Sequence, residues 1–339
     1  MRLIKTEDAV GHVLCHDMTQ IIKDQYKDAR FRKGHVVTEE DIPVLLSMGK
    51  EHLYVWEMTP GMVHENDAAE RLLALCGQEN MIRSGVKEGK IELKAACDGV
   101  FLVDSARLVA VNSQDEVMIA TRKGGMAVRE GDKLAGMRVI PLIIEEEKLR
   151  KAEQAAGDKP LLSLKPYVRK TACIVATGGE VKKGLIKDTF TPVVIDKLKT
   201  YGIETLEVVY SGDGVENVRD AVLAMRGKKP DMILCTGGMS VDPDDNTPGG
   251  IKAAGANIIA YGAPVLPGAM FLLGYFDDGT PVMGLPGCVM YAGATVFDLI
   301  LPRVAADVPV TRADIAALGE GGLCLGCKPC RYPLCPFGK

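Results

Sequence analysis

The segment from Asp231 to Gly250 contains the residues best suited to chemistry. It opens with a short apolar run that is typical of a strand buried on both faces of a sheet. Gly237 and Gly238 follow, and glycines at this place let the backbone approach a ligand while their N–H groups bind an anion. Three carboxylates come next, at Asp242, Asp244 and Asp245. We therefore expect phosphate on the amides and a divalent cation on the carboxylates; the alternative is an acidic surface turn after a core strand.

The elements around this segment should bring further polar loops to the same edge. Predicted strands alternate with predicted helices from residue 168 to 306, which indicates right-handed βαβ units and a parallel sheet. Ligands of such sheets bind beyond the carboxyl ends of the strands. Three predicted strands end in loops with glycine and polar residues: Thr177-Gly178-Gly179-Glu180, Ser211-Gly212-Asp213 and Thr236-Gly237-Gly238. We expect these three loops to converge on one site.

The rest of this region follows the same pattern. Helices are predicted near 189–200, at 215–226 and from about Gly249, the last after a cap and first turn at Asn246-Thr247-Pro248. Asp278-Gly279 predicts the turn of a hairpin between two apolar strands. Leu285-Pro286-Gly287-Cys288 should then lead into an apolar helix that ends near Pro302.

Composition limits the class of protein. The chain has 339 residues, 47% apolar and 25% charged, which is ordinary for a soluble globular protein of two or three domains. A net charge of −4 gives no reason to expect nucleic acid or an anionic membrane as partner. The first residues carry charges throughout, so no secretory signal is predicted. The apolar stretch from Val289 to Leu301 contains Asp298 and is too short to span a bilayer. A cytoplasmic location with reduced thiols is expected.

We predict five regions along the chain. They are a small α+β unit at 1–60, a β-rich domain with one helix at 61–144, a linker helix at 145–167, an α/β domain at 168–306, and a cysteine-rich tail at 307–339. In the first region Thr38 to Asp41 reads as a capping box, before a helix that ends at Gly49, and residues 52–56 read as a strand.

In the second region Asn66 or Asp67 should cap a helix that stops at Gly77, and residues 91–144 read as short strands, 107–112 among them. The five histidines lack the spacing of metal ligands and are expected to be structural.

Several motifs together resemble the molybdopterin-binding domains of molybdopterin molybdotransferase (the molybdenum insertase) and of molybdopterin adenylyltransferase. The segment TGGMSVDPDDNTP resembles their GG-x-S-x-G…D signature, and ATGGEVKKGLIKDTF resembles a TGDE-type segment. The tripeptide Ser211 to Asp213 resembles a V-x-D segment. Leu266-Pro267-Gly268 resembles a K-P-G-K loop, and Gly284 to Cys288 resembles a G-L-P-G-N turn. The resemblance covers about residues 170–305, and its two P-G motifs favour the insertase branch.

The resemblance implies a three-layer αβα fold and a site for molybdopterin or its adenylate, with molybdate and Mg²⁺, in a transferase of molybdenum cofactor biosynthesis. By position, the catalytic carboxylates would be Asp245, Asp213, Asp188 and Glu180, with Asp245 and Asp213 binding the metal. The pterin and its phosphate would contact Thr177, Gly178, Gly179, Thr236, Gly237, Gly238, Ser240, Asp242, Thr247, Pro248, Pro267, Gly268, Leu285, Pro286, Gly287 and Cys288. The metal would offset the charge of these substrates and of the leaving AMP.

This chain departs from the family pattern at defined positions. The first acid of TGDE is Gly179, the two lysines around P-G are Leu266 and Ala269, the signature glycine is Asp242, and the last Asn is Cys288. Each lost cation would weaken anion binding by about 1–3 kcal/mol if it were buried and paired. Lys182, Lys183, Lys252 and Arg303 are candidates to compensate. The small C-terminal β domain of insertases is also missing.

The tail carries four thiols, at Cys324, Cys327, Cys330 and Cys335. The spacing C-x2-C-x2-C-x4-C-P is one residue longer than a ferredoxin-type four-iron motif. An iron–sulfur cluster is favoured slightly over tetrahedral Zn²⁺, and a tail without a metal is the remaining alternative.

The sequence thus predicts an insertase-type protein of molybdenum cofactor biosynthesis that forms homo-oligomers. The alternatives are a non-catalytic pterin carrier, chaperone or adaptor for a client molybdoenzyme, and an adenylyltransferase.

Overall fold

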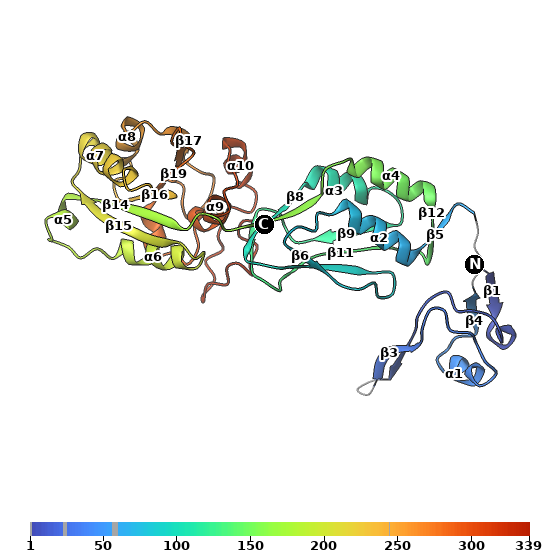
Figure 1. Cartoon of the computed structure of the whole chain (residues 1–339). Helices are drawn as coiled ribbons and strands as arrows, with labels where there is room; N and C mark the ends of the chain where they lie inside the picture. The colour runs from blue at the N-terminus through green and yellow to red at the C-terminus, as the bar shows by residue number, and fades with distance from the viewer. Residues whose placement is uncertain (1, 23–25, 56–59, 244) are drawn as a thin grey trace. The chain divides into compact units, whose positions relative to one another are not determined.

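The computed structural model describes the whole chain apart from residues 1, 23–25, 56–59 and 244 and the side chains of Tyr26 and Glu180. It divides into two compact units, which are described separately (Figure 1). The first unit comprises Met1–Ala96, Val103–Gly124 and Glu130–Ser163, and the second comprises Cys97–Leu102, Gly125–Arg129 and Leu164–Lys339. The five-region division expected from the sequence stays a prediction.

The second unit is built on a six-stranded sheet with the strand order β15-β14-β16-β19-β18-β17. Its strands are β14 (Thr171–Thr177), β15 (Glu204–Ser211), β16 (Met232–Thr236), β17 (Asn257–Tyr261), β18 (Leu272–Tyr275) and β19 (Pro281–Leu285). Its helices are α5 (Gly179–Lys182), α6 (Phe190–Lys199), α7 (Val215–Arg226), α8 (Thr247–Ala253), η2 (Gly287–Met290), α9 (Val296–Ala305) and α10 (Arg312–Ala317). The pairs β14–β15, β14–β16 and β16–β19 are parallel, whereas β18 is antiparallel to both of its neighbours.

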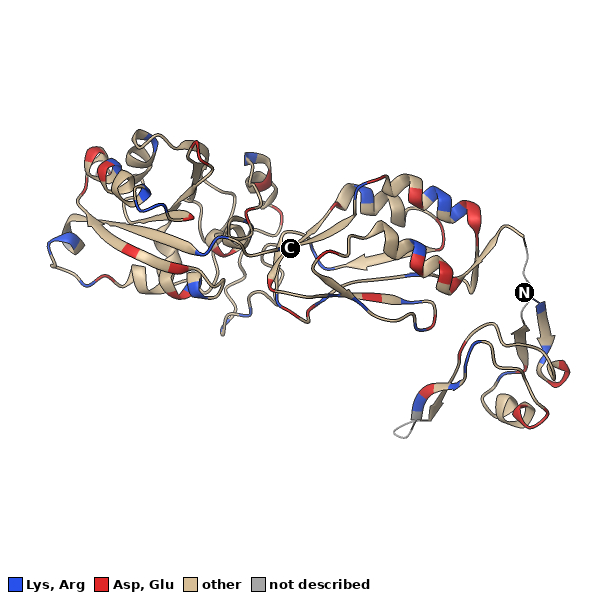
Figure 2. Ribbon diagram, viewed as in Figure 1, with Lys and Arg blue, Asp and Glu red and all other residues tan. Residues whose placement is uncertain are grey.

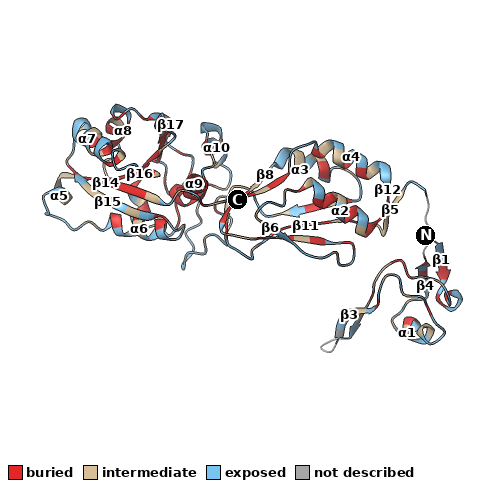
Figure 3. Cartoon of the chain, viewed as in Figure 1, coloured by how far each residue is buried: buried red, intermediate tan, exposed pale blue. Residues whose placement is uncertain are grey.

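Helices cover both faces of this sheet. Alternate residues of β14 and β16 point to opposite faces. On one face Ile174 and Leu234 pack with α6 and α9, and on the other Val175 and Cys235 pack with α7 and α8. The strands β14, β16 and β19 are buried along almost their whole length, as a doubly covered parallel sheet requires (Figure 3). The predicted three-layer α/β fold is confirmed.

Two element predictions in this unit need correction. The apolar helix was expected from Val289, but the helix begins at Val296 because the side chain of Thr295 accepts from the N–H of Phe297 and caps it there. Residues 287–290 form the short 3-10 helix η2 instead. Strand β17 was not predicted, because a short apolar run between Gly255 and Gly262 carries little periodicity.

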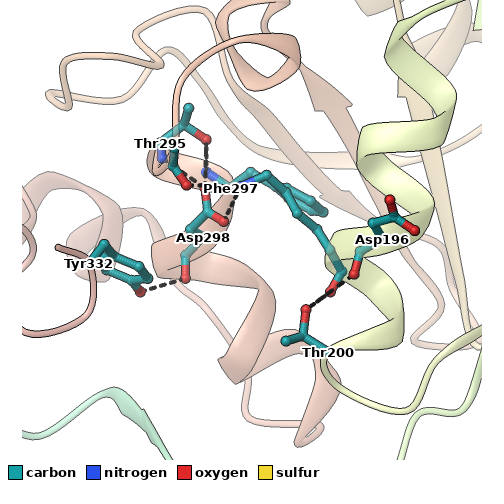
Figure 4. A network of polar contacts seen from close by, with 8 residues as sticks. Asp196, Thr200, Thr295, Phe297, Asp298 and Tyr332 are labelled. Atoms are coloured by element: carbon teal, nitrogen blue, oxygen red, sulfur yellow. Dashed lines mark hydrogen bonds and ion pairs between the residues drawn. The ribbon is translucent and has the colours of Figure 1, made fainter. Parts of the chain in front are cut away.

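The C-terminal tail is docked on the second unit. Its ends meet where the N–H of Gly338 donates to the carbonyl oxygen of Gly321 at 2.9 Å. Phe337 is 2% exposed and belongs to the core cluster that contains α6 and α9. The Tyr332 hydroxyl donates to the carbonyl oxygen of Asp298 at 3.0 Å (Figure 4). Residues 321–338 therefore form a closed loop against the core, which we call the clasp.

The first unit contains several small sheets and helices. Its strands are β1 (Arg2–Lys5), β2 (Met18–Ile22), β3 (Tyr26–Phe31), β4 (His52–Val55), β5 (Met62–His64), β6 (Met81–Arg83), β7 (Ile91–Ala95), β9 (Val117–Thr121), β11 (Lys133–Val139) and β12 (Ile143–Glu145). The strands β8 (Gly99–Val103), β10 (Met126–Val128) and β13 (Leu162–Pro166) form a three-stranded sheet whose residues belong mostly to the second unit. Its helices are η1 (Thr6–Asp8), α1 (Asp41–Ser47), α2 (Glu65–Leu75), α3 (Ser105–Asn112) and α4 (Glu146–Ala156).

Helix α4 is packed rather than isolated. Leu149, Ala152 and Ala156 are buried on its inner side. Charged residues of both signs lie along α4 (Figure 2). Glu146 and Glu153 pair with Arg71 of α2 at 2.8 and 2.7 Å.

Three predictions in the first unit were wrong in detail. Residues 107–112 form helix α3 instead of a strand, because Asp104 accepts from the N–H of Arg107 and caps the helix, and a short apolar run does not separate strand from helix by itself. Helix α2 is capped by His64, whose ring accepts from the N–H of Asn66, instead of by Asn66 or Asp67.

Helix α1 begins at Asp41 with Glu40 as its cap, two residues later than the capping-box prediction implies. The Asp41 carboxylate accepts from the N–H and hydroxyl of Thr38, but this turn precedes the helix. Trp56, expected in the strand after this helix, lies outside the described residues. No described helix combines the length and the apolar composition that crossing a bilayer requires.

Candidate functional site

Five loops meet at the carboxyl edge of the second unit's sheet. The parallel strands end in register, with Thr177 beside Ser211 and Thr236 beside Leu285. Because β18 runs antiparallel, the loop between β17 and β18 also lies at this edge. The five loops are 178–189, 212–214, 237–246, 262–271 and 286–295. The convergence expected for the three glycine-bearing loops is therefore present.

Two buried threonines join the first loop to the third. The Thr177 hydroxyl donates to the carbonyl oxygen of Thr236 at 3.0 Å, and the Thr247 hydroxyl donates to that of Gly237 at 2.9 Å. The two hydroxyl oxygens lie 3.1 Å apart. Both side chains are less than 9% exposed, so this contact is shielded from water. The pair fixes the backbone where the glycine loop begins.

Gly237 and Gly238 are required by the backbone itself. Their φ angles are +82° and +54°, in the left-handed region that favours glycine. A Cβ on Gly237 would lie 2.4 Å from the carbonyl oxygen of Thr177, and one on Gly238 would lie 2.7 Å from the Thr247 hydroxyl oxygen. The two glycines thus permit the close contact of loop and strand.

The remainder of the third loop is held from two sides. Met239 is 3% exposed, and its sulfur occupies the place where a Cβ on Gly284 would lie, at 2.5 Å. The Tyr261 hydroxyl donates to the carbonyl oxygen of Met239 at 3.0 Å. Further along, the N–H of Asp242 donates to the Asp245 carboxylate at 3.0 Å. The predicted acids Asp242 and Asp245 are thereby brought together, whereas Asp244 lies outside the described residues.

Gly179 and Asp213 are adjacent. The N–H of Gly179 donates to Oδ2 of Asp213 at 3.0 Å, and a Cβ on Gly179 would lie 2.7 Å from the same oxygen. Glycine at the position of the family's first acid therefore makes room for the Asp213 carboxylate. The Lys182 side chain lies close to Gly212, the residue before Asp213, so the side chain places a cation at this edge. The side chain of Glu180, in α5, lies outside the described residues.

Asp188 accepts hydrogen bonds from the backbone at the start of helix α6. Its Oδ1 accepts from the N–H groups of Phe190 and Thr191 at 2.9 and 3.0 Å, at the start of α6. Burial alone would raise the pKa of Asp188, but hydrogen bonds from Thr191, Phe190 and Tyr210 together lower it. The carboxylate is thus a helix cap that stays ionised, and its catalytic role stays a prediction.

The fourth and fifth loops contact α9 and the clasp. The N–H of Val296 donates to the carbonyl oxygen of Pro267 at 3.3 Å, and a Cβ on Gly268 would lie 2.6 Å from Val296. Leu266 forms a parallel bridge with Leu323 of the clasp, with backbone hydrogen bonds of 2.8 Å on both sides. Leu266, which stands where the resembled family has a lysine, is therefore hydrogen-bonded to the clasp.

The start of α9 is fixed by a buried polar network. Asp298 Oδ2 accepts from the N–H and hydroxyl of Thr295, at 2.7 and 3.2 Å (Figure 4). Its Oδ1 accepts from Lys197 of α6 at 2.5 Å. Cys288, earlier in the fifth loop, is half-buried, and burial raises the pKa of its thiol. At neutral pH Cys288 is thus a neutral thiol in the place of the family's Asn.

Of the remaining predicted contacts, Ser240 is exposed and Pro248 lies in the first turn of α8. Leu285 ends β19, and Pro286 and Gly287 begin the fifth loop. Gly178 precedes α5 with a φ of +137°.

The four thiols of the clasp fall into two classes. Cys324 and Cys335 are partly buried against the core cluster, whereas Cys327 and Cys330 are exposed. Among the described residues, no three His, Cys, Asp or Glu side chains are placed together as a metal site. The clasp cysteines therefore do not form a ready-made tetrahedral centre in this arrangement.

Arg303 does not replace a missing lysine. It lies near the far end of α9 and pairs with Asp314 at 3.0 Å. The next residues, up to Ala305, contact the chain entering β14, at the opposite edge of the sheet. A cavity of about 650 Å³ between α6 and the edge strand β15 also shares no residue with the five loops.

Two tyrosines at the site were missed by sequence reasoning. Tyr210 lies next to the end of β15 and Tyr261 ends β17. Tyr210 belongs to a strand that was predicted, so its place at the edge could have been read from the sequence. Tyr261 belongs to the strand that was not predicted, so no sequence signal placed it there.

Models of known protein families match two parts of the chain. Residues 173–306 match the family described as a probable molybdopterin binding domain, and residues 3–57 match a domain of unknown function. No curated protein matches the chain.

Solved structures with a similar arrangement are distant. The molybdopterin biosynthesis Mog protein from Mycobacterium ulcerans is 20% identical, with a TM-score of 0.35, over 41% of this chain and 97% of that protein. The protein CinA with unknown function from Thermoplasma acidophilum is 17% identical, with a TM-score of 0.34, over 40% of this chain and 98% of that protein. A molybdenum cofactor biosynthesis protein from Pyrococcus furiosus is 12% identical, with a TM-score of 0.27, over 93% of this chain and 64% of that protein. Residues 173–306 are thus assigned, by the family match, to the probable molybdopterin binding domains.

Proposed function

We propose that the second unit binds molybdopterin or its adenylate at the carboxyl edge and inserts molybdate with release of AMP. The observation that carries this proposal is the pair of hydrogen bonds from the buried Thr177 and Thr247 hydroxyls, which hold the start of the Gly237–Gly238 loop at the edge where five loops converge. Backbone N–H groups in such a loop bind phosphate oxygens. The family match to residues 173–306 supports the pterin as the ligand.

Magnesium would be held by Asp245 and Asp213. Each carboxylate has one oxygen engaged by a backbone N–H, which orients it. Mg²⁺ is usually bound by one or two carboxylates together with substrate phosphates, so one aspartate from each of two loops at this edge would supply ligands of the right chemistry. When bound, the metal would offset the charge of the phosphates and of molybdate. The chain's own residues would orient the phosphate on the loop amides.

A carrier or adaptor for a client molybdoenzyme is the second candidate. Leu266 stands where a family lysine is expected and is bound to the clasp, so that cation is not replaced at its own position. Large apolar side chains are also exposed on three loops of the same edge: Leu185 at 71%, Val241 at 82% and Tyr291 at 77%. Such side chains suit contact with a protein partner. Adenylyltransferase activity is the third candidate and would require ATP.

We further propose that the four clasp thiols bind a soft metal, as an iron–sulfur cluster or as Zn²⁺. Support comes from the hydrogen bond between Gly338 and Gly321, which closes the clasp and confines all four thiols to one short loop. Metal binding would have to draw them together from their present positions. Anaerobic purification followed by iron, sulfide and zinc analysis tests this, with Cys327→Ser as the variant and Cys288→Ser as the control. A protein without bound metal would contradict it.

The enzymatic proposal is tested by AMP release from adenylated molybdopterin with Mg²⁺ and molybdate. Molybdate-dependent release that Asp245→Asn abolishes would support an insertase. Tight pterin binding without release of AMP would support the carrier instead. ATP-dependent adenylation of molybdopterin would support an adenylyltransferase.

A further inference from the structure

Tyr261 connects the edge of the sheet to the glycine-bearing loop 237–246. It is the last residue of β17, and its hydroxyl lies 3.0 Å from the carbonyl oxygen of Met239 and 3.4 Å from that of Ser240. The hydroxyl donates to these acceptors. The residue is 43% exposed, so part of the ring remains open to the solvent side of the site.

This contact completes the fixation of the loop. The loop's beginning is held by Thr247, whose hydroxyl donates to Gly237. The Met239 side chain is buried over Gly284, where no Cβ competes for the space. The Tyr261 hydroxyl then holds the Met239 carbonyl group. Three contacts on consecutive parts of one short loop leave its amides little freedom to turn away from a ligand.

The loop that Tyr261 holds also carries the predicted metal-binding acid Asp245. Asp245 is itself tied to the loop, because its N–H donates to the carbonyl oxygen of Asp242 at 2.9 Å and its carboxylate accepts from the Asp242 N–H. Tyr261 therefore lies where it can influence both halves of the loop.

We propose that Tyr261 is a positioning residue that orients the amides of residues 237–240 for a phosphate-bearing pterin. This inference rests on the proposed function of the site. It assigns Tyr261 no contact with reacting atoms; its hydroxyl acts through the Met239 and Ser240 carbonyl groups.

The test compares two variants that each remove one hydroxyl. Tyr261→Phe removes the contact with the loop. Tyr275→Phe is the matched control, because its hydroxyl accepts from the N–H of Val310 at 3.3 Å and Tyr275 pairs with Pro281 at the opposite edge. We expect Tyr261→Phe to weaken molybdopterin binding about three- to tenfold, the range that the loss of one hydrogen bond gives. Tyr275→Phe should leave it unchanged.

Two further readouts separate positioning from general stability. Amide hydrogen exchange at residues 239–242 should be faster in Tyr261→Phe than in Tyr275→Phe and the wild type. In a double-mutant cycle, the effects of Tyr261→Phe and Asp245→Asn on binding should not add, because both act through one loop.

Unchanged exchange in the loop of Tyr261→Phe would overturn the inference, as would additive effects in the cycle. If the wild type binds no pterin, the proposed function fails instead, and the exchange comparison still decides whether Tyr261 holds the loop.

Discussion

The hydroxyl oxygens of Thr177 and Thr247 lie 3.1 Å apart, although the two residues are 70 positions apart in the sequence. Each hydroxyl also donates to a backbone carbonyl group, of Thr236 and Gly237 respectively. The two hydroxyl groups thus have only two protons for three contacts. When both hydroxyls donate to the carbonyl groups, no proton lies between the two hydroxyl oxygens. The position of the glycine loop relative to β14 depends on this small buried arrangement.

Removing the Thr247 hydroxyl should destabilise the second unit. In Thr247→Val the partly buried Gly237 carbonyl oxygen loses its donor, which should lower the free energy of unfolding by about 1 kcal/mol, the net contribution of an ordinary hydrogen bond. Thr247→Ser keeps the hydroxyl and should lose less. Urea unfolding of both variants measures the difference. Equal stability of the valine and wild-type proteins would show that the contact contributes nothing.

Gly237→Ala should lower the free energy of unfolding by more than the positive φ of residue 237 alone explains. The new Cβ meets the Thr177 carbonyl oxygen at 2.4 Å. Gly279→Ala is the matched control, since Gly279 has a φ of +80° and a Cβ added there would have no atom within 4 Å. We expect about 1 kcal/mol for the control, the lower end of the cost of a left-handed residue, and at least about 2 kcal/mol for Gly237→Ala. Equal losses in urea unfolding would argue against the close contact.

Asp188 should make the stability of the second unit sensitive to acid. Its folded-state pKa lies below the ordinary value of 3.8, so the unfolded state binds the proton more tightly. The stabilisation is present above the ordinary value and is lost as pH falls through the folded-state pKa. Unfolding measured between about pH 6 and pH 2 should show a smaller acid-induced loss for Asp188→Asn than for the wild type. Parallel curves would contradict a lowered pKa.

The clasp should stabilise the second unit through Phe337. Phe337→Ala would leave a cavity in the core cluster and should cost about 3–5 kcal/mol. Leu334 lies in the same loop but is 84% exposed, so Leu334→Ala should change the unfolding free energy by less than about 0.5 kcal/mol. Thermal and urea unfolding compare them. A small effect for Phe337→Ala would mean that the clasp is not docked in solution.

The sequence predicted most of the second unit because its signals are local. Strands and helices alternate between Thr171 and Arg226, and each strand ends at a glycine-bearing loop, so the edge and its loops follow from topology alone. One prediction failed because the local signal is ambiguous. Residues 107–112 form a helix although their run of apolar residues also fits a strand.

Contacts between distant segments were also beyond reach of the sequence. The clasp meets Leu266 through backbone atoms and meets the carbonyl oxygen of Asp298 through Tyr332, and contacts with backbone atoms leave no mark on residue type at Leu266 or Asp298. The same holds for Tyr261, whose acceptors are carbonyl groups. The roles of the individual site residues stay predictions.

The most direct test of the pterin site is equilibrium binding of molybdopterin to three proteins: the wild type, Ser240→Glu and Val168→Glu. Ser240 is exposed on the glycine-bearing loop, so a carboxylate there should repel the phosphate without disturbing the core. Val168 is 56% exposed before β14 at the opposite edge and receives the same charge. The wild type and Val168→Glu should bind alike, and Ser240→Glu should lose binding. Equal binding by all three, or by none, would contradict a pterin site at the carboxyl edge.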